Sequence, residues 1–305
     1  MNFVLGLDLG TTALKGVLVD SSGRIAASTS EEYPLSSPLP GWSEQDPQDW
    51  WLALGRACSR LVTELAPTDK LMAVGLSGQM HGAVFLDRQG NVLHPAILWN
   101  DQRTAEQCQQ IIDLSGGNIV GWTLNPPRTA FTASKILWLR QHRPEIYERV
   151  QHVLLPKDYL RYRLTGSFVT DVSDASGTGL LDVARRQWSQ ATLDALSIPR
   201  SWLPDVVESI DISGRVSADA ERATGLPVGT PVVGGAADQT AAAIGNGVTR
   251  SGLVSLTLGT SGVVYTQLGD VVVDPSGCFH TFCHAVPETW QMMAGVLSAG
   301  GSFRW

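Results

Sequence analysis

Two short sequences have the residues of a phosphate-binding turn, each at the end of an alternating apolar stretch. They are Leu7-Asp8-Leu9-Gly10-Thr11-Thr12 and Leu256-Thr257-Leu258-Gly259-Thr260-Ser261. A glycine followed by two hydroxyl residues lets the backbone turn sharply, approach an anion and present N–H and O–H donors to phosphate oxygens. The duplication indicates two half-sites that face each other across a cleft, although ordinary hairpin turns use the same residue types.

Two aspartates have the sequence context of phosphoryl-transfer carboxylates. Asp8 ends a predicted strand beside the first turn, where a carboxylate can hold Mg²⁺ through the ion's waters. Asp238 follows the small residues Gly234-Gly-Ala-Ala237 and precedes an alanine-rich run that favours a helix, so it is a candidate base for the proton of an attacking hydroxyl. The structural alternatives are an Asp8 bonded to its own turn and an Asp238 that caps the helix.

Three segments carry side chains of the kind that a sugar site uses. Gly78-Gln-Met80-His81-Gly82 leaves a predicted strand, and its two glycines indicate a backbone that lies close to a ligand. Trp99-Asn100-Asp101 concentrates polar groups that can bond sugar hydroxyls, and Trp42 offers an apolar ring face to a sugar. The alternatives are a core or surface histidine, a capped helix start and buried aromatic rings.

Strands must position the first turn and the Met80-His81 segment. Alternation predicts strands over about 3–9, 13–19 and 24–33, so the first Gly-Thr-Thr turn is a hairpin. A hairpin excludes the Walker A loop, whose Gly-Lys-Ser/Thr is missing here, and the dinucleotide fingerprint, which needs a helix directly after the turn. Residues 71–77 are typical of a fully buried strand that leads into the loop 78–82.

Helices complete an α/β pattern. Asp46-Pro47 is typical of an N-cap followed by proline at the first helical position, and apolar residues at helical spacing predict a helix that stops at Pro67. We expect further helices over 103–114, 132–141, 156–165 (ended by Gly166) and 189–196, and further strands over 231–235, 253–258, 262–267 and 290–297.

Composition limits the class of protein. The chain has 305 residues and a net charge of -7, without a basic run long enough to follow a nucleic-acid backbone, so no nucleic-acid partner is expected. Neither a signal peptide nor an apolar run of membrane-spanning length is evident, which favours a cytoplasmic protein without a membrane partner. The four cysteines are too scattered for a disulfide framework.

One cysteine and histidine cluster resembles a zinc site at first sight. Alternation along a strand places Cys278, His280 and His284 on one face and Cys283 on the other, which is poor geometry for a tetrahedral site. We therefore expect a strand there, with buried thiols and hydrogen-bonded imidazoles.

A change of composition near 245–252 predicts a domain boundary, because a run of small residues gives way to new strands there. Residues 1–247 then form a first domain, and residues 248–305 form the start of a second. The second segment is shorter than the usual free-standing domain, so an incomplete second domain is expected.

Eight blocks together resemble the FGGY carbohydrate kinases, and within that family the members that phosphorylate D-xylulose. The blocks follow the family's order along the whole chain: 6–12, 42–47, 78–82, 94–101, 154–160, 171–178, 234–238 and 258–262. The resemblance implies an α/β fold of two actin-like domains, each on a ribonuclease-H-like core with a mixed sheet flanked by helices, which close over ATP and a sugar.

The resemblance also implies roles for particular residues. Asp238 corresponds to the catalytic base, and Asp8 corresponds to the carboxylate that serves Mg²⁺ and phosphate. The Met80-His81 pair favours a ketopentose, D-xylulose, over glycerol, and Trp99, Asn100 and Asp101 are expected near the sugar. The implied phosphate contacts are Thr11, Thr12, Lys15, Gly259 and Thr260. ATP, Mg²⁺ and a homodimer are further expectations of the resemblance.

The chain departs from the family pattern at its end. The kinases continue through the bulk of the second domain and a glycine-rich segment that receives adenine, whereas this chain stops at Trp305, with Arg304 where an acidic residue is usual. This favours, as an alternative, a sugar-binding fragment with weak or no catalysis, in which the strands 253–258 and 290–297 lack partners. A kinase for a related ketose or polyol is another alternative. An actin-like or chaperone-like ATPase is a third, but it has no use for Trp42, His81 and Asn100.

Overall fold

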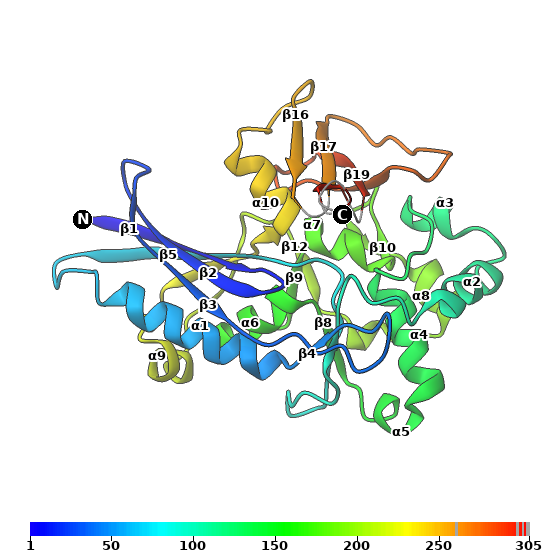
Figure 1. Ribbon diagram of the computed structural model, residues 1–305, viewed down its shortest axis with the longest axis horizontal. Coiled ribbons are helices and arrows are strands. Elements are labelled where there is room, and N and C mark those ends of the chain that lie inside the picture. Colours follow the sequence, from blue (N-terminus) through cyan, green and yellow to red (C-terminus); the bar gives the residue numbers. More distant parts are fainter. Residues whose placement is uncertain (260–261, 297–298, 301, 303–305) are drawn as a thin grey trace.

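The computed structural model describes residues 1–259, 262–296, 299–300 and 302. Figure 1 shows a long twisted sheet at one end of the molecule, a mostly helical region at the other end, and a smaller sheet above their junction. The predicted α/β class, with a mixed sheet flanked by helices, is confirmed. Thr260, Ser261, Arg304 and Trp305, which the sequence analysis singled out, lie outside the described residues.

The main sheet has seven strands in the order β13-β14-β5-β1-β2-β3, with β15 also paired to β5. It is mixed, because β1 is antiparallel to β2 and parallel to β5. Its strands are β1 (Asn2–Leu9), β2 (Ala13–Asp20), β3 (Ile25–Glu32), β5 (Lys70–Gly78), β13 (Ile212–Arg215), β14 (Pro231–Val233) and β15 (Ala236–Ala237).

The predicted hairpin at the N-terminus is confirmed. β1 and β2 pair from Phe3–Asp20 to Leu9–Leu14, which leaves Gly10, Thr11 and Thr12 in the turn. Alternate residues of β1 point to opposite faces, so Leu5, Leu7 and Leu9 are buried in the core while Asp8 faces the other side. The strand alternation therefore directs the Asp8 carboxylate away from the core.

The helix α1 (Pro47–Val62) packs on β2 and β3. Asp46 caps it as predicted, because its carboxylate accepts a hydrogen bond from the Gln48 N–H at 2.8 Å. The prediction of a helix that runs to Pro67 was wrong: α1 ends at Val62, and the next amides bond three residues back instead of four. The buried face of α1 consists of Trp50, Ala53, Leu54, Ala57, Cys58 and Leu61.

Two more helices cover the same face of the main sheet, as Figure 1 shows. They are α6 (Pro156–Thr165), which the left-handed Gly166 ends as predicted, and α9 (Ala218–Thr224). The opposite face is more open along β5, so the prediction of a fully buried strand was wrong. Ala73, Gly75 and Ser77 on that face are partly exposed, while Val74 and Leu76 on the core face are buried.

The helical region has a hydrophobic core of its own. Its helices are α2 (Ala105–Leu114), α3 (Ile119–Thr123), α4 (Thr132–His142), α5 (Pro144–Tyr147), α8 (Gln190–Leu196) and the 3₁₀ turn η2 (Arg200–Trp202). Short paired strands accompany them: β4 (Glu44–Gln45) with β7 (Ala96–Ile97), β6 (Val84–Leu86) with β8 (His152–Leu154), β9 (Val169–Asp171) with β12 (Asp205–Val207), and β10 (Leu181–Asp182) with β11 (Gln187–Trp188). The four helices predicted after α1 are confirmed as α2, α4, α6 and α8.

The smaller sheet has four antiparallel strands in the order β16-β17-β19-β18. They are β16 (Val254–Leu258), β17 (Gly262–Leu268), β18 (His280–Cys283) and β19 (Trp290–Val296). The expectation that the strands 253–258 and 290–297 lack partners was wrong, because β16 pairs with β17 and β19 lies between β17 and β18. β16 is an edge strand, and its Leu256 is 62% exposed.

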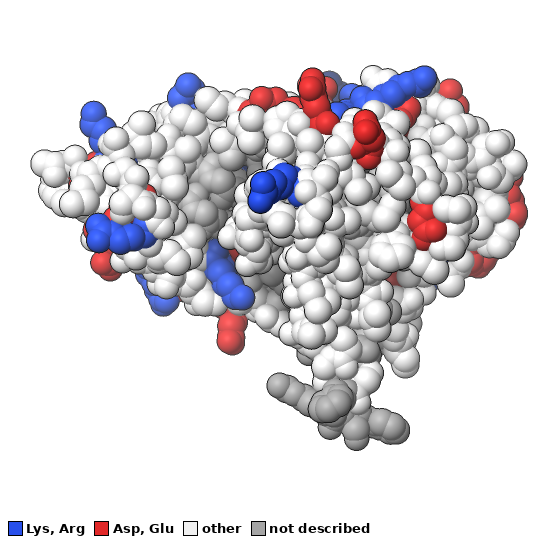
Figure 2. All heavy atoms as spheres, turned by 90° about the horizontal axis from the view of Figure 1, so that it is seen from above, with Lys and Arg blue, Asp and Glu red and all other residues white. Residues whose placement is uncertain are grey.

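A short helix joins the two sheets. α10 (Asp238–Gly245) follows β15 directly, and the turns α7 (Val172–Ala175) and η1 (Ser176–Thr178) lie beside β15 and β18. Among the described helices, none combines the length and apolar character that a bilayer crossing requires. Figure 2 shows charged side chains scattered over the face seen from above, with Lys and Arg in separate small groups.

Candidate active site

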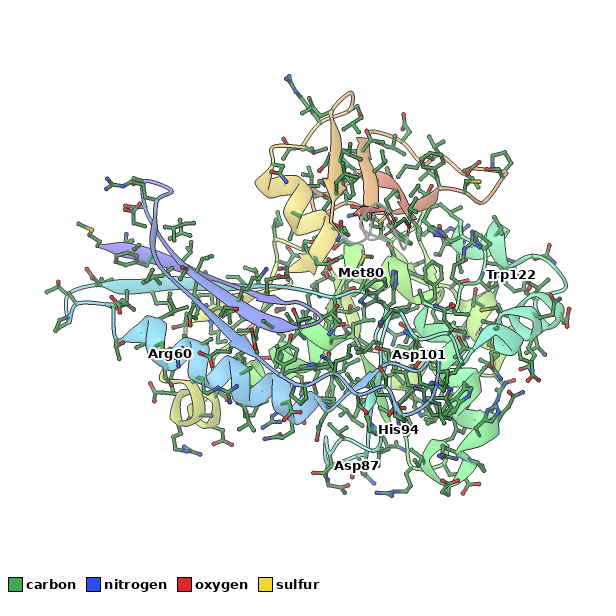
Figure 3. The ribbon with its side chains drawn as sticks, in the orientation of Figure 1. Arg60, Met80, Asp87, His94, Asp101 and Trp122 are labelled. Carbon is green, nitrogen blue, oxygen red and sulfur yellow. The ribbon has the colours of Figure 1, made fainter. Side chains whose placement is uncertain are left out.

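A cavity of about 260 Å³ lies where the loop after β5, the start of α10 and the smaller sheet meet. Figure 3 shows Met80 at this junction, beneath the smaller sheet. The cavity brings together residues from distant parts of the sequence. The predicted site residues that line it are Thr11, Met80, His81, Trp99 and Asp238.

Asp238 is the first residue of α10, and its backbone follows directly from β15. It is not the cap, since Ala237 occupies that position, so the N-cap alternative was wrong. One carboxylate oxygen accepts a hydrogen bond from the Gln239 N–H at 2.7 Å. Burial, together with the negative charge of Asp8, raises the pKa of Asp238 to about 7. A carboxyl group with this pKa can take up and release a proton near neutral pH.

His81 is held in an unusual backbone conformation at the floor of the cavity. Its φ is 68°, in the left-handed region that few non-glycine residues adopt. Its carbonyl oxygen accepts hydrogen bonds from Lys135 Nζ at 2.8 Å and Thr132 Oγ1 at 3.1 Å, and both donors lie on α4. The backbone of the loop is therefore fixed by buried side chains of the helical region.

The ring of His81 has a defined tautomer. Nδ1 lies 2.7 Å from the Gly177 carbonyl oxygen, and because a carbonyl can only accept, Nδ1 carries the proton. Burial and the nearby charge of Lys135 lower the pKa of His81 to about 3, so the imidazole is neutral near pH 7. Nε2 then retains its lone pair and can only accept a hydrogen bond from a ligand.

The first turn contributes Thr11 to the cavity. Trp99 Nε1 donates to Thr11 Oγ1 at 3.0 Å, and Gln45 Nε2 donates to the Thr11 carbonyl at 2.7 Å. A hydroxyl that accepts from an indole keeps its own proton to donate. Thr12, the next residue of the turn, is exposed.

Asp8 and Lys15 lie opposite each other in the β1–β2 ladder and face a second hollow of about 540 Å³. One oxygen of Asp8 accepts a hydrogen bond from Ser77 Oγ at 2.7 Å. A single carboxylate with an oxygen directed to open space fits Mg²⁺, which keeps most of its waters and uses one or two protein carboxylates. Among the described residues, no group of three ligating side chains forms a closed metal cage.

Asp101 and Asn100, which the resemblance implied near the sugar, do not line the cavity. Asp101 is fully buried, and its carboxylate accepts bonds from the Ser43 N–H at 2.6 Å and from Arg103 Nε at 2.9 Å. Figure 3 shows Asp101 farther from the smaller sheet than Met80. The expectation that Asp101 meets the sugar is not supported by this placement, because both carboxylate oxygens are engaged within the helical region.

Trp42 does not line the cavity. The Arg103 guanidinium lies over the ring, with 3.5 Å between Cζ and the ring centroid, and Trp138 packs edge-on at 5.5 Å. One face of the ring is therefore engaged in a cation–π stack with Arg103, which favours the alternative of a packed aromatic residue for Trp42.

The cavity also contains aromatic residues that the sequence analysis did not assign to it. Phe131, His280 and Phe282 line it together with Arg128. The rings of His280 and Phe282 are stacked with their centroids 5.8 Å apart, and the ring of Phe131 lies 5.0 Å from that of His81. The period-two alternation of β18 was a signal, since it places His280 and Phe282 on one face. Cys278 precedes the strand, which is shorter than expected.

The second turn is only partly described. Gly259 ends the segment after β16 and is exposed, and its carbonyl accepts a hydrogen bond from the Gly300 N–H at 3.0 Å. Thr260 lies outside the described residues. The pairing of β16 with β17 nevertheless confirms the predicted strand pair on either side of this turn.

Comparison with known proteins identifies the family. Residues 3–245 match the family described as "FGGY family of carbohydrate kinases, N-terminal domain". The xylulose kinase of Escherichia coli K12 is 41% identical over 302 residues, which is 99% of this chain and 62% of that protein. The crystal structure of a xylulose kinase from Rhodospirillum rubrum superimposes with a TM-score of 0.95 at 30% identity, over 99% of this chain and 62% of that one. The chain belongs to the FGGY family of carbohydrate kinases, so the resemblance noted in the sequence is confirmed.

The structural similarity extends to a kinase that is named for another substrate. A gluconate kinase from Lactobacillus acidophilus superimposes with a TM-score of 0.93 at 29% identity, over all of this chain and 61% of that protein. The fold is accordingly the actin-like fold of the FGGY kinases, as expected. This chain spans about 62% of the length of the relatives that it matches.

Proposed function

We propose that this chain provides the sugar site, the catalytic base and the first phosphate turn of a kinase. The reaction transfers the γ-phosphoryl group of ATP to D-xylulose and gives D-xylulose 5-phosphate. One observation carries the proposal: Asp238, with its pKa raised to about 7, lines the same cavity as Met80, His81 and Thr11.

Asp238 acts as the base in this proposal. Phosphoryl transfer has a loose transition state, so the attacking hydroxyl needs orientation more than early deprotonation. The carboxylate accepts a hydrogen bond from the terminal hydroxyl of the sugar and takes its proton as the new P–O bond forms. Because its pKa is near 7, a substantial share of the molecules carries the carboxylate form at neutral pH.

His81 orients the sugar in the same proposal. Since Nδ1 donates to the Gly177 carbonyl, Nε2 accepts a hydrogen bond from a sugar hydroxyl. Met80, Phe131 and Phe282 form a small apolar cluster beside it, which contacts the C–H faces of the sugar and excludes water. The site therefore combines fixed acceptors with an apolar wall, as ligand sites of this size usually do.

The phosphates of ATP are assigned to the two turns. We propose Thr11, Thr12 and Lys15 on the first turn and Gly259 and Thr260 on the second as phosphate contacts. Mg²⁺, held near Asp8 through its waters, would offset negative charge on the β- and γ-phosphate oxygens. Lys15, opposite Asp8 in the ladder, adds a positive charge on the same side of the sheet.

D-xylulose is the proposed sugar because the relatives with about 40% identity are named xylulose kinases. The Met80-His81 pair at the cavity supports the same substrate. The related gluconate kinase structure shows that this fold also carries other substrates, so the sugar has to be tested directly.

An ADP-release assay on this chain tests the proposal, with D-xylulose, D-ribulose, D-gluconate and glycerol each supplied with ATP and Mg²⁺. We expect ADP release that depends on the sugar and is fastest with D-xylulose. A faster rate with D-ribulose or glycerol would refute the assigned substrate. Calorimetric binding of D-xylulose without any ADP release would refute the kinase activity and support a sugar-binding fragment.

A further inference from the structure

The segment 171–178, which comprises Asp171, α7 and η1, contacts His81 and the residue before Asp238 without lining the cavity. The Gly177 carbonyl accepts from His81, as described above. Ser176 Oγ accepts a hydrogen bond from the Cys283 N–H at 3.0 Å, at the end of β18. Ser173 Oγ accepts from the Ala237 N–H at 3.1 Å, directly before Asp238. This one segment thus holds the loop 78–82, the end of β18 and the start of α10.

Within this segment, Ser173 bonds to the residue that directly precedes the candidate base Asp238. Its side chain is fully buried, and its hydroxyl donates to Asp171 Oδ2 at 2.5 Å while it accepts from Ala237. The donor and acceptor functions of this hydroxyl are therefore both used. Since Ala237 is the N-cap residue of α10, the bond from its amide to Ser173 attaches the start of the helix to this segment.

Asp171 is anchored in turn by a buried ion pair. Its other oxygen lies 2.7 Å from Lys157 Nζ, and neither side chain is exposed. Lys157 Nζ also lies 2.6 Å from Asp158 and 3.4 Å from Asp174, so the ammonium group is held by three carboxylates. Breaking such a buried pair is costly, so a displacement of Asp171 is disfavoured.

We propose that Ser173 is a positioning residue for Asp238. A series of buried polar contacts runs from Lys157 through Asp171 and Ser173 to the Ala237 amide. These contacts fix the position of the Asp238 carboxylate in the cavity. The consequence for catalysis rests on the proposed kinase function, whereas the consequence for the helix start does not.

A second hydrogen bond, from α10 to the smaller sheet, explains why the bond between Ser173 and the Ala237 amide matters. Thr240 Oγ1 donates to Gln291 Oε1 at 2.8 Å, and this glutamine lies on β19 of the smaller sheet. Asp238 is therefore held between two anchors, one on each side of the junction. With the Ser173 hydroxyl removed, the buried Ala237 amide loses its acceptor and the helix start can follow the smaller sheet. A displacement of about 1 Å at a reacting group lowers rates by about 100-fold.

The test compares S173A with S209A. Ser209 is also a buried serine, and its Oγ donates to the same oxygen of Asp171 at 2.7 Å, but it is not bonded to the Ala237 amide. The first readout is the exchange rate of the Ala237 amide, measured by NMR on the whole chain. We expect about tenfold faster exchange in S173A and no change in S209A, because only S173A removes the acceptor of the Ala237 amide.

The second readout is the kinetics of D-xylulose phosphorylation. S173A is expected to lower kcat by about 10- to 100-fold with KM for the sugar unchanged, since the carboxylate is displaced and the His81 side of the site is not. S209A is expected to retain kcat. S173C keeps a weak acceptor and should fall between the wild type and S173A in both readouts.

Equal amide exchange in S173A and S209A would overturn the proposal, and so would equal kcat values. If none of the proteins releases ADP, the kinase function is refuted, and the Ala237 exchange rate still decides whether Ser173 positions the helix. If S173A does not fold, S173C provides the same comparison with S209A.

Discussion

Replacing the candidate base with asparagine should make the protein more stable at neutral and alkaline pH. Asp238 is partly buried and lies near the negative charge of Asp8, and these two causes raise its pKa from 3.8 to about 7. The variant D238N removes the charge but keeps an oxygen that can accept from the Gln239 N–H, as Asp238 does at 2.7 Å. The expected gain in stability is therefore electrostatic.

The sign follows from the two protonation equilibria. Because the folded state binds the Asp238 proton more tightly than the unfolded state, this group stabilises the fold at a pH below about 3.8, and the contribution is lost as the pH rises to about 7. Each pH unit inside this window changes the free energy of unfolding by about 1.4 kcal/mol. Between pH 5 and pH 7 the stability difference between D238N and the wild type should widen by about 2 kcal/mol, and above pH 8 it should be constant.

Urea unfolding at several pH values from 5 to 9 measures this difference. D205N is a suitable control, because Asp205 is 87% exposed and its replacement should change the stability by less than about 0.5 kcal/mol throughout. A stability difference between D238N and the wild type that stays constant from pH 5 to pH 8 would refute the argument that burial and the charge of Asp8 raise the pKa of Asp238.

Three further variants test the geometry around the cavity. G177A should weaken sugar binding at least tenfold in calorimetry, because the new Cβ would lie 2.5 Å from His81 Nδ1; unchanged affinity would contradict the assigned role of that ring. G235A should lower the free energy of unfolding by about 3 kcal/mol, since this residue has a φ of 76° and the Cβ would lie 2.1 Å from the Leu76 carbonyl; a loss below about 1 kcal/mol in urea would contradict it. D101N should cost about 3 kcal/mol of stability by unpairing the buried Arg103 and should leave the sugar dissociation constant unchanged, whereas weaker sugar binding at unchanged stability would show that Asp101 contacts the sugar.

The sequence was sufficient wherever a local signal fixes the structure. The capping aspartate and proline located the start of α1, and Gly166, with its φ of 77°, ended α6 at the expected residue. The Gly-Thr-Thr turn followed from alternation on both sides of it. These features depend on residues within a few positions of one another, so periodicity and turn chemistry are enough to predict them.

Features that depend on distant residues were not predictable in the same way. Asp101 has the composition of a sugar ligand, but its partner Ser43 is 58 residues away and converts it into a buried anchor. Trp42 likewise packs against Arg103, which is distant from it in the sequence. His280 and Phe282 reach the cavity only because the smaller sheet packs beside the Met80-His81 loop, which no local pattern reveals. The partial exposure of Ala73, Gly75 and Ser77 likewise depends on what covers the second face of the main sheet.

The central claim is that Asp238 acts as the base on a sugar hydroxyl bound beside His81. The most direct measurement is the initial rate of ADP release with ATP, Mg²⁺ and saturating D-xylulose, compared between the wild type and D238N, with D205N as the control. We predict sugar-dependent release that falls by about 10²- to 10⁴-fold in D238N and is unchanged in D205N. Release that continues without sugar, or that D238N leaves at the wild-type rate, would contradict the claim.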